Sequence, residues 1–423
     1  MNLLDQLSDH PVLNSYYRDR LSNLILDRLR TTAMEFGTLV ANAEGAYPTD
    51  ILILLKELEA DNKVLESDGL WFLHNQQNQP HVRQVGVDVN MVSQSAGELP
   101  EPHPLDFDWR FTDDTLANLE IILETKCGEG AILGAPTLYK YLSDIGATVS
   151  LFDKNPAMIE YFKSAGYVSA TQVDLVHAAQ FSRRFSWALA DPPWYDEHYT
   201  GFLSAASKLL LPHGKLFLSV LPRLTRPSAA EDRFRIVERA HRIGFDLVDI
   251  SPAALAYTSP PFEIAALREA GFVLGNWRKG DLFAFVLSPD RRHEDCTLLE
   301  AHEAQWKTIH LGTTIIRVRL VSTDNSVDFR YRSASSTGSS RLQTVSRRSP
   351  ARLDANVWNS RNIALVVSRP DVLSNSLVCI ADGGTPSEVL NRMSVTHQLD
   401  GSDVTQLREV LELLLQDAGL QWQ

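Results

Sequence analysis

Three aspartates in the middle of the chain each stand at the end of a short apolar run. They are Asp153, Asp174 and Asp191. Apolar runs of this length, alternating with helical patterns, are typical of parallel strands, and open sheets bind ligands at the carboxyl ends of such strands. We therefore expect the three carboxylates to lie at one edge of a sheet and to form a site. A single acid at a strand end is also a common helix N-cap, and that alternative stays open for each.

The run that ends at Asp191 stops abruptly in Pro192, Pro193, Trp194 and Tyr195. Proline lacks a backbone N–H and fixes φ, so the strand must end at this point. Asp191 to Trp194 thus lie where open sheets usually do their chemistry. These four are the predicted catalytic residues, and Tyr195 is a further residue predicted to contact the substrate.

A tight turn at Gly134 supplies the other half of the predicted site. Asp153 follows Gly134 by nineteen residues, close to the roughly twenty that separate a glycine turn from a ribose-binding acid in dinucleotide folds. Asp174, after the next strand, would accept a hydrogen bond from an adenine amino group. These three are the predicted cofactor-binding residues. The turn holds one glycine only and continues as Ala135 and Pro136.

Residues 106–290 must position these groups, and they alternate between strand and helix patterns. This alternation predicts an α/β domain with a mostly parallel, doubly wound sheet. The expected strands are 130–134, 148–153, 168–173, 186–190, 215–221, 245–250 and 282–287, and the expected helices are 115–126, 135–145, 156–165, 201–211 and 229–243.

Residues 1–78 are expected to form a small separate domain of three helices and a hairpin. The helices are expected at 17–29, 33–43 and 48–61, and the hairpin strands 64–66 and 70–73 flank an Asp-Gly turn. This order resembles a winged helix. Its third helix has one lysine against four acids, whereas a helix that reads duplex DNA needs positive charge. A role in homodimer formation or substrate gating is therefore favoured, and the polar residues 79–105 are expected to be a linker.

Residues 291–423 are expected to form an α+β domain, with strands at 313–321, 326–331, 363–367 and 377–380 and a helix at 404–415. Within it, residues 315–370, here called the arginine-rich segment, contain ten arginines, three aspartates and no lysine. Guanidinium groups suit phosphates, so Arg347 and Arg348 are predicted to contact nucleic acid, with Tyr331 and Trp358 stacking on bases. The alternative is a set of solvated strand faces paired with acidic domains.

Across 110–290 the order of elements resembles the class I S-adenosylmethionine-dependent methyltransferases, which have a Rossmann-like sheet. Asp191-Pro192-Pro193-Trp194 is similar to the Asp-Pro-Pro-Tyr/Trp motif of amino methyltransferases, above all the N6-adenine type. The resemblance implies S-adenosylmethionine as cofactor and no metal. It also implies that Asp191 and the Pro192 carbonyl hold the target amine while Trp194 stacks on the target base, which in duplex DNA must be flipped out.

A second resemblance covers more of the chain. A winged helix followed by a Rossmann-like domain with this motif is similar to the branched-chain polyamine synthases, which transfer aminopropyl groups from decarboxylated S-adenosylmethionine. That family carries acids after the glycine where this chain has residues 135–138, Ala-Pro-Thr-Leu. A polyamine is a multiply charged cation that needs carboxylates around it. Methyl transfer to an amine is therefore the leading hypothesis. Aminopropyl transfer and an inactive interaction protein that retains the fold are the alternatives.

Composition limits the remaining choices. The chain has 423 residues and a net charge of −13, which argues against coating nucleic acid over the whole surface. No apolar run approaches the roughly eighteen residues of a membrane span, and the first residues do not resemble a signal peptide. Three scattered cysteines form neither a disulfide framework nor a metal-ligand pattern. A cytoplasmic protein without a membrane partner is expected.

Overall fold

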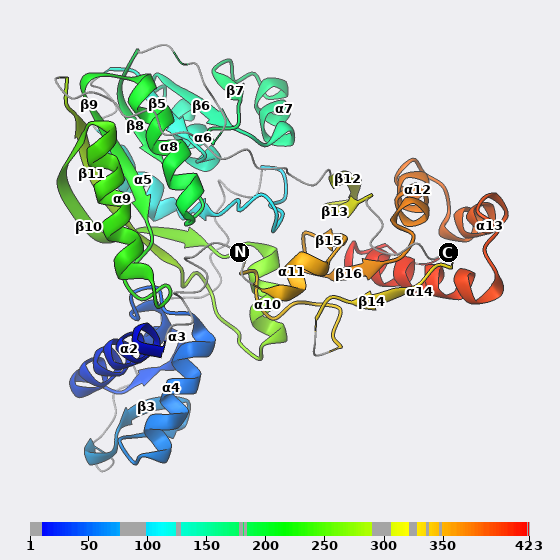
Figure 1. Ribbon diagram of the computed structural model, residues 1–423, viewed down its shortest axis with the longest axis horizontal. Helices are drawn as coiled ribbons and strands as arrows, with labels where there is room; N and C mark the ends of the chain where they lie inside the picture. The colour runs from blue at the N-terminus through cyan, green and yellow to red at the C-terminus, as the bar shows by residue number, and fades with distance from the viewer. Residues whose placement is uncertain are drawn as a thin grey trace. The chain divides into compact units, whose positions relative to one another are not determined.

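The computed structural model describes residues 11–76, 99–123, 128–176, 181, 184–289, 306–320, 328–335, 338–346, 349–420 and 422. Figure 1 shows the chain coloured from one terminus to the other.

The chain divides into two compact units. The first comprises Met1–Pro100, Trp109–Ser259 and Leu274–Glu300, and the second comprises Glu101–Asp108, Pro260–Val273 and Ala301–Gln423. Two short segments that precede residue 300 therefore belong to the second unit.

An eight-stranded sheet forms the centre of the first unit. Its strands are β4 (Arg110–Phe111), β5 (Gly130–Leu133), β6 (Val149–Asp153), β7 (Ala170–Gln172), β8 (Phe185–Ala190), β9 (Leu210–Val220), β10 (Phe245–Thr258) and β11 (Lys279–Leu287). They lie in the order β4-β10-β11-β9-β8-β5-β6-β7. Strands β7, β6, β5, β8 and β9 are parallel, whereas β11 joins β9 antiparallel. The predicted doubly wound α/β sheet is confirmed, with an antiparallel end.

Five helices cover this sheet, which makes a three-layer domain. They are α5 (Asp113–Ile122), α6 (Pro136–Asp144), α7 (Pro156–Ser164), α8 (Asp196–Leu209) and α9 (Ala229–Ile243). Helices α5, α6 and α7 pack on the face that carries Ile132 and Leu189, and α8 and α9 pack on the face of Ala131 and Ala188 (Figure 1). Apolar residues on both faces explain the uninterrupted hydrophobic strands, since the central strands are buried on each side.

Helix α8 differs from its predicted start at residue 201. It begins five residues earlier, at Asp196. Asp196 and Glu197 stand in its first turn, where negative charge stabilises the helix dipole. As a result the helix starts directly after the predicted catalytic residues and limits the freedom of that loop.

The N-terminal part of the first unit contains α2 (Pro11–Thr31), β1 (Met34–Glu35), α3 (Phe36–Ala41), α4 (Pro48–Ala60), β2 (Val64–Ser67) and β3 (Leu70–Leu73). The strands form a small sheet in the order β1-β3-β2. Asp68 and Gly69 both have positive φ, of 53° and 78°, as the hairpin turn requires. The predicted helix at 33–43 is wrong in its first residues, because Met34 and Glu35 pair with β3 before the helix begins. The lysine of α4, Lys56, lies 5.0 Å from the Trp71 ring centroid.

The second unit is built on an antiparallel five-stranded sheet. Its strands are β12 (Trp306–Leu311), β13 (Thr314–Arg319), β14 (Tyr331–Ser333), β15 (Val357–Asn359) and β16 (Ala364–Val367), in the order β12-β13-β15-β16-β14. Helices α10 (Pro261–Glu269), α11 (Pro350–Asp354), α12 (Pro370–Ala381), α13 (Pro386–Thr396) and α14 (Gly401–Asp417) belong to the same unit.

The strand predicted at 377–380 is wrong, because these residues lie in α12. Pro370 stands at the start of this helix, where its missing N–H costs nothing. Leu373, Leu377 and Ile380 then recur at helical spacing and are buried against the sheet. A short apolar run alone does not distinguish a buried helix from a strand. Of the strand predicted at 326–331, residues 328–330 are not in a strand and β14 begins at Tyr331, while 326 and 327 lie outside the described residues.

His103 is completely buried in the second unit. Its Nε2 donates to the Trp358 carbonyl oxygen at 3.0 Å, and its Nδ1 accepts from the Leu105 N–H at 3.1 Å, so the imidazole is neutral. Burial lowers its pKa well below the usual value, and the positive charges of Arg317 and Arg352 lower the pKa further.

We expect His103 to make the protein less stable in mild acid. Around pH 6.5 the unfolded chain begins to bind a proton at this residue that the folded chain excludes, so stability falls by about 1.4 kcal/mol in total between pH 7.5 and 5.5. Urea unfolding across this range measures the pH slope. His103→Gln should remove this loss, and the exposed His74→Gln should leave the slope unchanged. Equal slopes for wild type and His103→Gln would contradict the assignment.

Candidate active site

The switch point of the sheet lies between β5 and β8, because the chain leaves β5 toward β6 while β8 pairs on the other side. Gly134 ends β5 with a φ of 69°, and Asp191 follows β8. The Asp191 N–H donates to the Leu133 carbonyl oxygen at 3.0 Å. A Cβ at Gly134 would lie 3.0 Å from Phe202 Cε1 and 3.3 Å from the Asp191 carbonyl oxygen. The glycine turn and the predicted catalytic residues are thus in contact.

The two other strand-end acids lie at the same edge of the sheet. Asp153 ends β6, which pairs with β5 in parallel, and Asp174 follows β7. Asp153 Oδ1 accepts from the Asn155 N–H at 2.8 Å, and Asp174 Oδ1 accepts from the Val176 N–H at 2.9 Å. These local bonds fix the two loops that follow the strands. The structure therefore brings together the strand ends that carry Gly134, Asp153, Asp174 and Asp191, as the sequence predicted.

Asp191 is bound by a tyrosine from a distant strand. The Tyr257 hydroxyl donates to Asp191 Oδ1 at 2.8 Å and lies 2.7 Å from Ser219 Oγ. Trp194 Nε1 donates to the same Ser219 Oγ at 3.3 Å. Burial and the negative charge of Asp191 raise the pKa of Tyr257 well above its usual value. The phenol therefore stays protonated and remains a donor to Asp191.

Trp194 is held from several sides. Its ring lies 5.9 Å from that of Tyr257 in an edge-to-face arrangement, and the guanidinium of Arg278 lies 5.7 Å from its centroid. The Arg226 Nη1 donates to the Trp194 carbonyl oxygen at 2.8 Å. Tyr195, the further residue predicted for the substrate, is half-buried, and Arg226 lies 5.9 Å from its ring. Trp194 is thus a fixed side chain.

A buried ion pair fixes the strands behind the motif. Arg233 on α9 donates to Asp281 Oδ2 on β11 at 2.6 Å and to the Leu221 carbonyl oxygen at 2.7 Å. Tyr199 is also buried, and its hydroxyl accepts from the Leu221 N–H at 3.2 Å. These contacts hold the ends of β9 and β11 on which the residues around Trp194 depend.

Sequence reasoning missed Tyr257, Ser219 and Arg226, which come from β10, β9 and the loop after β9. Ser219 is the polar residue of the otherwise apolar stretch 216–221. A fully buried hydroxyl in such a strand needs a hydrogen-bond partner. The polar Ser219 within an apolar strand could therefore have indicated a buried hydrogen bond, but the sequence does not show that its partner is Tyr257.

The arginine-rich segment proves to be a structural network in its described part. Six of its arginines pair with acids: Arg317 with Asp106, Arg330 with Asp403, Arg332 with Asp354, Arg341 with Asp417, Arg361 with Glu101 and Arg369 with Asp371. Arg319 and Arg352 donate to backbone carbonyls. The predicted stacking role of Trp358 is wrong, because its side chain is completely buried and donates to Asn362. Arg347 and Arg348 lie outside the described residues.

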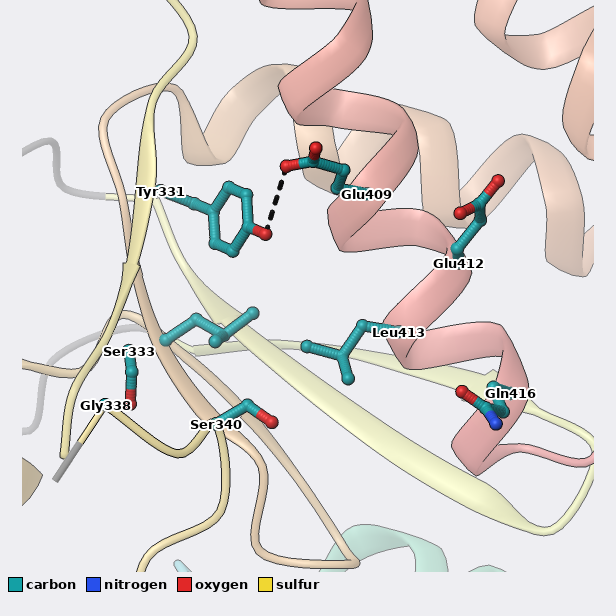
Figure 2. Close-up of a pocket in the computed structure, with 9 residues that line it drawn as sticks. Tyr331, Ser333, Gly338, Ser340, Glu409, Glu412, Leu413 and Gln416 are labelled. Atoms are coloured by element: carbon teal, nitrogen blue, oxygen red, sulfur yellow. Dashed lines mark hydrogen bonds between the residues drawn. The ribbon is translucent and has the colours of Figure 1, made fainter.

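Two cavities lie elsewhere. One, of about 440 Å³, is in the second unit and is lined by Tyr331, Ser333, Gly338, Ser340, Leu365, Glu409, Glu412, Leu413 and Gln416. Figure 2 shows Tyr331 pointing toward Glu409, to which its hydroxyl donates at 3.2 Å. The other, of about 430 Å³, lies between α9 and β10. Gly134, Asp153 and Asp191 line neither cavity.

The described residues contain no group of three or more histidines, cysteines and acids that could hold a metal ion. Among the described helices, none combines the length and the apolar character that crossing a membrane requires.

No family model matches the sequence, and no curated protein matches it either. Among solved structures, the chain is similar to the branched-chain polyamine synthase of Thermus thermophilus in complex with N4-aminopropylspermidine and 5′-methylthioadenosine. The C9 mutein of that protein has a TM-score of 0.53 and 12% identity over 68% of this chain and 95% of that chain. The unmodified synthase has a TM-score of 0.51 and 12% identity over 67% and 91% of the two chains.

The glycopeptide N-methyltransferase MtfA complexed with sinefungin has a TM-score of 0.30 and 15% identity over 42% of this chain and 95% of that chain. At these identities, the likeness to the synthase concerns the fold alone. Together with the strand order, it supports a Rossmann-like α/β fold for the sheet of the first unit.

Proposed function

We propose that this chain is a transferase that moves a group from an S-adenosylmethionine-type sulfonium to an amino group, in its simplest form an S-adenosylmethionine-dependent N-methyltransferase. One observation carries the proposal. Asp191-Pro192-Pro193-Trp194 stands at the switch point, in contact with the Gly134 turn. An acceptor site and a nucleoside site therefore adjoin each other at the edge where open sheets bind ligands.

The residues around Gly134 fit the nucleoside part of the donor. Glycine at φ 69° leaves space that a Cβ would fill against Phe202. Asp153 would hold the ribose hydroxyls and Asp174 the adenine amino group. Bound there, the sulfonium would supply an electrophilic carbon together with its own leaving group.

The start of helix α6 favours the intact donor over the decarboxylated one. The helix follows Gly134 and Ala135 directly and has no acid in its first turn. A helix N-terminus carries partial positive charge and stabilises carboxylates. The methionine carboxylate would gain from this position, whereas a decarboxylated donor has no carboxylate to place there.

On the acceptor side, Asp191 and the Pro192 carbonyl would accept hydrogen bonds from the amine. These bonds orient the nitrogen and keep its lone pair directed at the donor, which is catalysis by positioning. Trp194 would form the wall against which a flat acceptor stacks. This arrangement favours an exocyclic amine such as adenine N6.

Aminopropyl transfer is the second candidate function. It is supported by the likeness to the polyamine synthase, which includes 95% of that chain. It is opposed by the residues after Gly134, because Ala135, Pro136, Thr137 and Leu138 bring no carboxylate to a cationic substrate.

Titration calorimetry separates these functions. We expect S-adenosylmethionine to bind and the decarboxylated form to bind at least tenfold more weakly. Asp153→Ala should weaken binding, and the matched surface variant Asp249→Asn should not. Preference for the decarboxylated form would favour aminopropyl transfer. Binding of neither would reject both enzymes and leave a protein that keeps the fold for interaction.

The acceptor is identified by label transfer. Methyl-labelled S-adenosylmethionine is incubated with an adenine-containing oligonucleotide or with spermidine, and labelled product is counted. Transfer to the oligonucleotide supports an adenine-directed methyltransferase, and transfer to spermidine would instead identify a polyamine as the acceptor. Transfer to neither probe removes both of these acceptor classes.

A further inference from the structure

The directions of the hydrogen bonds around Asp191 follow from the chemistry of the four groups. An indole N–H can only donate, so Ser219 Oγ accepts from Trp194. A carboxylate can only accept, so the Tyr257 hydroxyl proton is directed at Asp191. A phenol has one proton, and Ser219 must therefore donate to the Tyr257 oxygen across their 2.7 Å contact. Trp194, Ser219, Tyr257 and Asp191 form one chain with a single direction.

This hydrogen-bond chain begins and ends in the same four-residue motif, Asp191 to Trp194. Trp194 and Asp191 are close in sequence, but the groups that join them come from β9 and β10. Ser219 and Tyr257 are completely or almost completely buried, at 0% and 1% exposure. Hydrogen bonds in such a chain polarise one another in a low-dielectric interior. The orientation of the acid is therefore coupled to that of the aromatic ring.

We propose that Tyr257 and Ser219 are positioning residues of the acceptor site, which set the Asp191 carboxylate and the Trp194 ring relative to each other. The proposal rests on the proposed function and extends it, because it assigns roles to two residues outside the motif. Neither residue takes or gives a proton in the reaction. Their contribution is to fix an acceptor geometry before the amine binds.

Packing around the chain supports a positioning role. Gly280 on β11 lies against both rings, and a Cβ there would come within 3.3 Å of Trp194 Cζ2 and of the Tyr257 hydroxyl. Tyr257 also packs against Phe111, with ring centroids 5.1 Å apart. The rings therefore have little room to rotate, and a hydroxyl removed from Tyr257 is not easily replaced by movement of a neighbour.

The first test detects the hydrogen-bond chain from Trp194 to Asp191 and does not depend on enzyme activity. The Trp194 indole N–H is observed as a ¹⁵N–¹H cross-peak, assigned with Trp194→Phe. We expect this peak to shift in Ser219→Ala and also in Tyr257→Phe, which does not touch the indole donor directly. The control is Tyr17→Phe, a buried tyrosine whose hydroxyl donates to Asp50 Oδ2 at 2.9 Å in the N-terminal helices instead. An unchanged Trp194 peak in Tyr257→Phe would show that Tyr257 and Trp194 are not coupled through Ser219, which contradicts the hydrogen-bond chain.

The second test measures transfer to the acceptor probe that gives the higher wild-type rate. A misplacement of a reacting group by about 1 Å can cost roughly 100-fold, so we expect Tyr257→Phe to lower kcat by about 10- to 100-fold with donor affinity unchanged. Ser219→Ala should lower kcat roughly tenfold. Because both act through one chain, the double variant should be no worse than Tyr257→Phe by more than about threefold. Ser219→Thr, which keeps the hydroxyl, should restore most of the rate.

The outcomes separate the inference from the proposed function. A shifted Trp194 peak with a wild-type kcat in Tyr257→Phe would overturn the positioning role and leave the transferase proposal intact. Additive effects of the two variants would overturn the coupling. A wild-type protein that binds no donor would overturn the transferase and the positioning role together, while the indole peaks would still decide whether the chain exists.

Discussion

Replacing Asp191 with alanine is expected to reduce transfer to an amine by roughly a hundredfold or more, because the amine is no longer oriented toward the donor. The side chain stands at the end of β8 and is oriented by the Tyr257 hydroxyl at 2.8 Å. Without the carboxylate, the amine loses the acceptor that directs its lone pair. Because Asp191 contacts the Gly134 turn through its backbone, donor affinity should change by less than about threefold.

The measurement is the rate of label transfer from methyl-labelled S-adenosylmethionine, with donor binding followed by calorimetry on the same samples. Asp249→Ala serves as the control, because it removes an exposed acid from β10, the strand that carries Tyr257. Asp249 Oδ2 accepts from the Ser251 hydroxyl at 3.2 Å. A wild-type rate in Asp191→Ala would contradict the assignment of this residue, and a loss of donor binding would place it on the donor side instead.

The sheet of the first unit could be predicted because its signals are local. Uninterrupted apolar runs end in acids, and proline stands at the start of α6 and α7. The errors occur where a tertiary contact decides the local structure. Met34 and Glu35 leave a helical pattern because β3 offers them a partner. Residues 377–380 are apolar enough for a strand, but the chain that precedes them starts a helix at Pro370.

The same distinction holds for the site. The positions of Gly134, Asp153, Asp174 and Asp191 at one edge of the sheet could be predicted because each lies at or just after a strand end. Their roles stay predictions. The contact of Tyr257 with Asp191 could not be predicted, because the two residues lie 66 positions apart along the sequence.

The arginine-rich segment shows the opposite error. Its local charge excess suggested a phosphate site, but Arg361 pairs with Glu101, which lies 260 residues earlier. When charges are summed over a short segment, acids that pair with it from elsewhere in the sequence are left out. The sum therefore overestimates the positive charge on the surface.

Gly134→Ala is expected to weaken donor binding at least tenfold and to destabilise the fold. Alanine at a φ of 69° costs about 1–2 kcal/mol for a left-handed backbone. Its Cβ would also stand 3.0 Å from Phe202 and 3.3 Å from the Asp191 carbonyl oxygen. The ring of Phe202 must shift, and the space through which a nucleoside approaches the turn becomes smaller.

Gly146→Ala is the matched control for this prediction. Gly146 has a φ of 83°, and a Cβ added there would meet no described atom within 4 Å, so alanine at this position carries the backbone cost alone. Thermal unfolding of the two variants therefore isolates the cost of packing at Gly134, and calorimetry with S-adenosylmethionine isolates its role in binding. We expect Gly146→Ala to lose stability but to bind the donor like wild type. Equal donor affinity in both variants would show that the Gly134 turn does not approach the nucleoside, and the donor site would then have to lie elsewhere on the edge of the sheet.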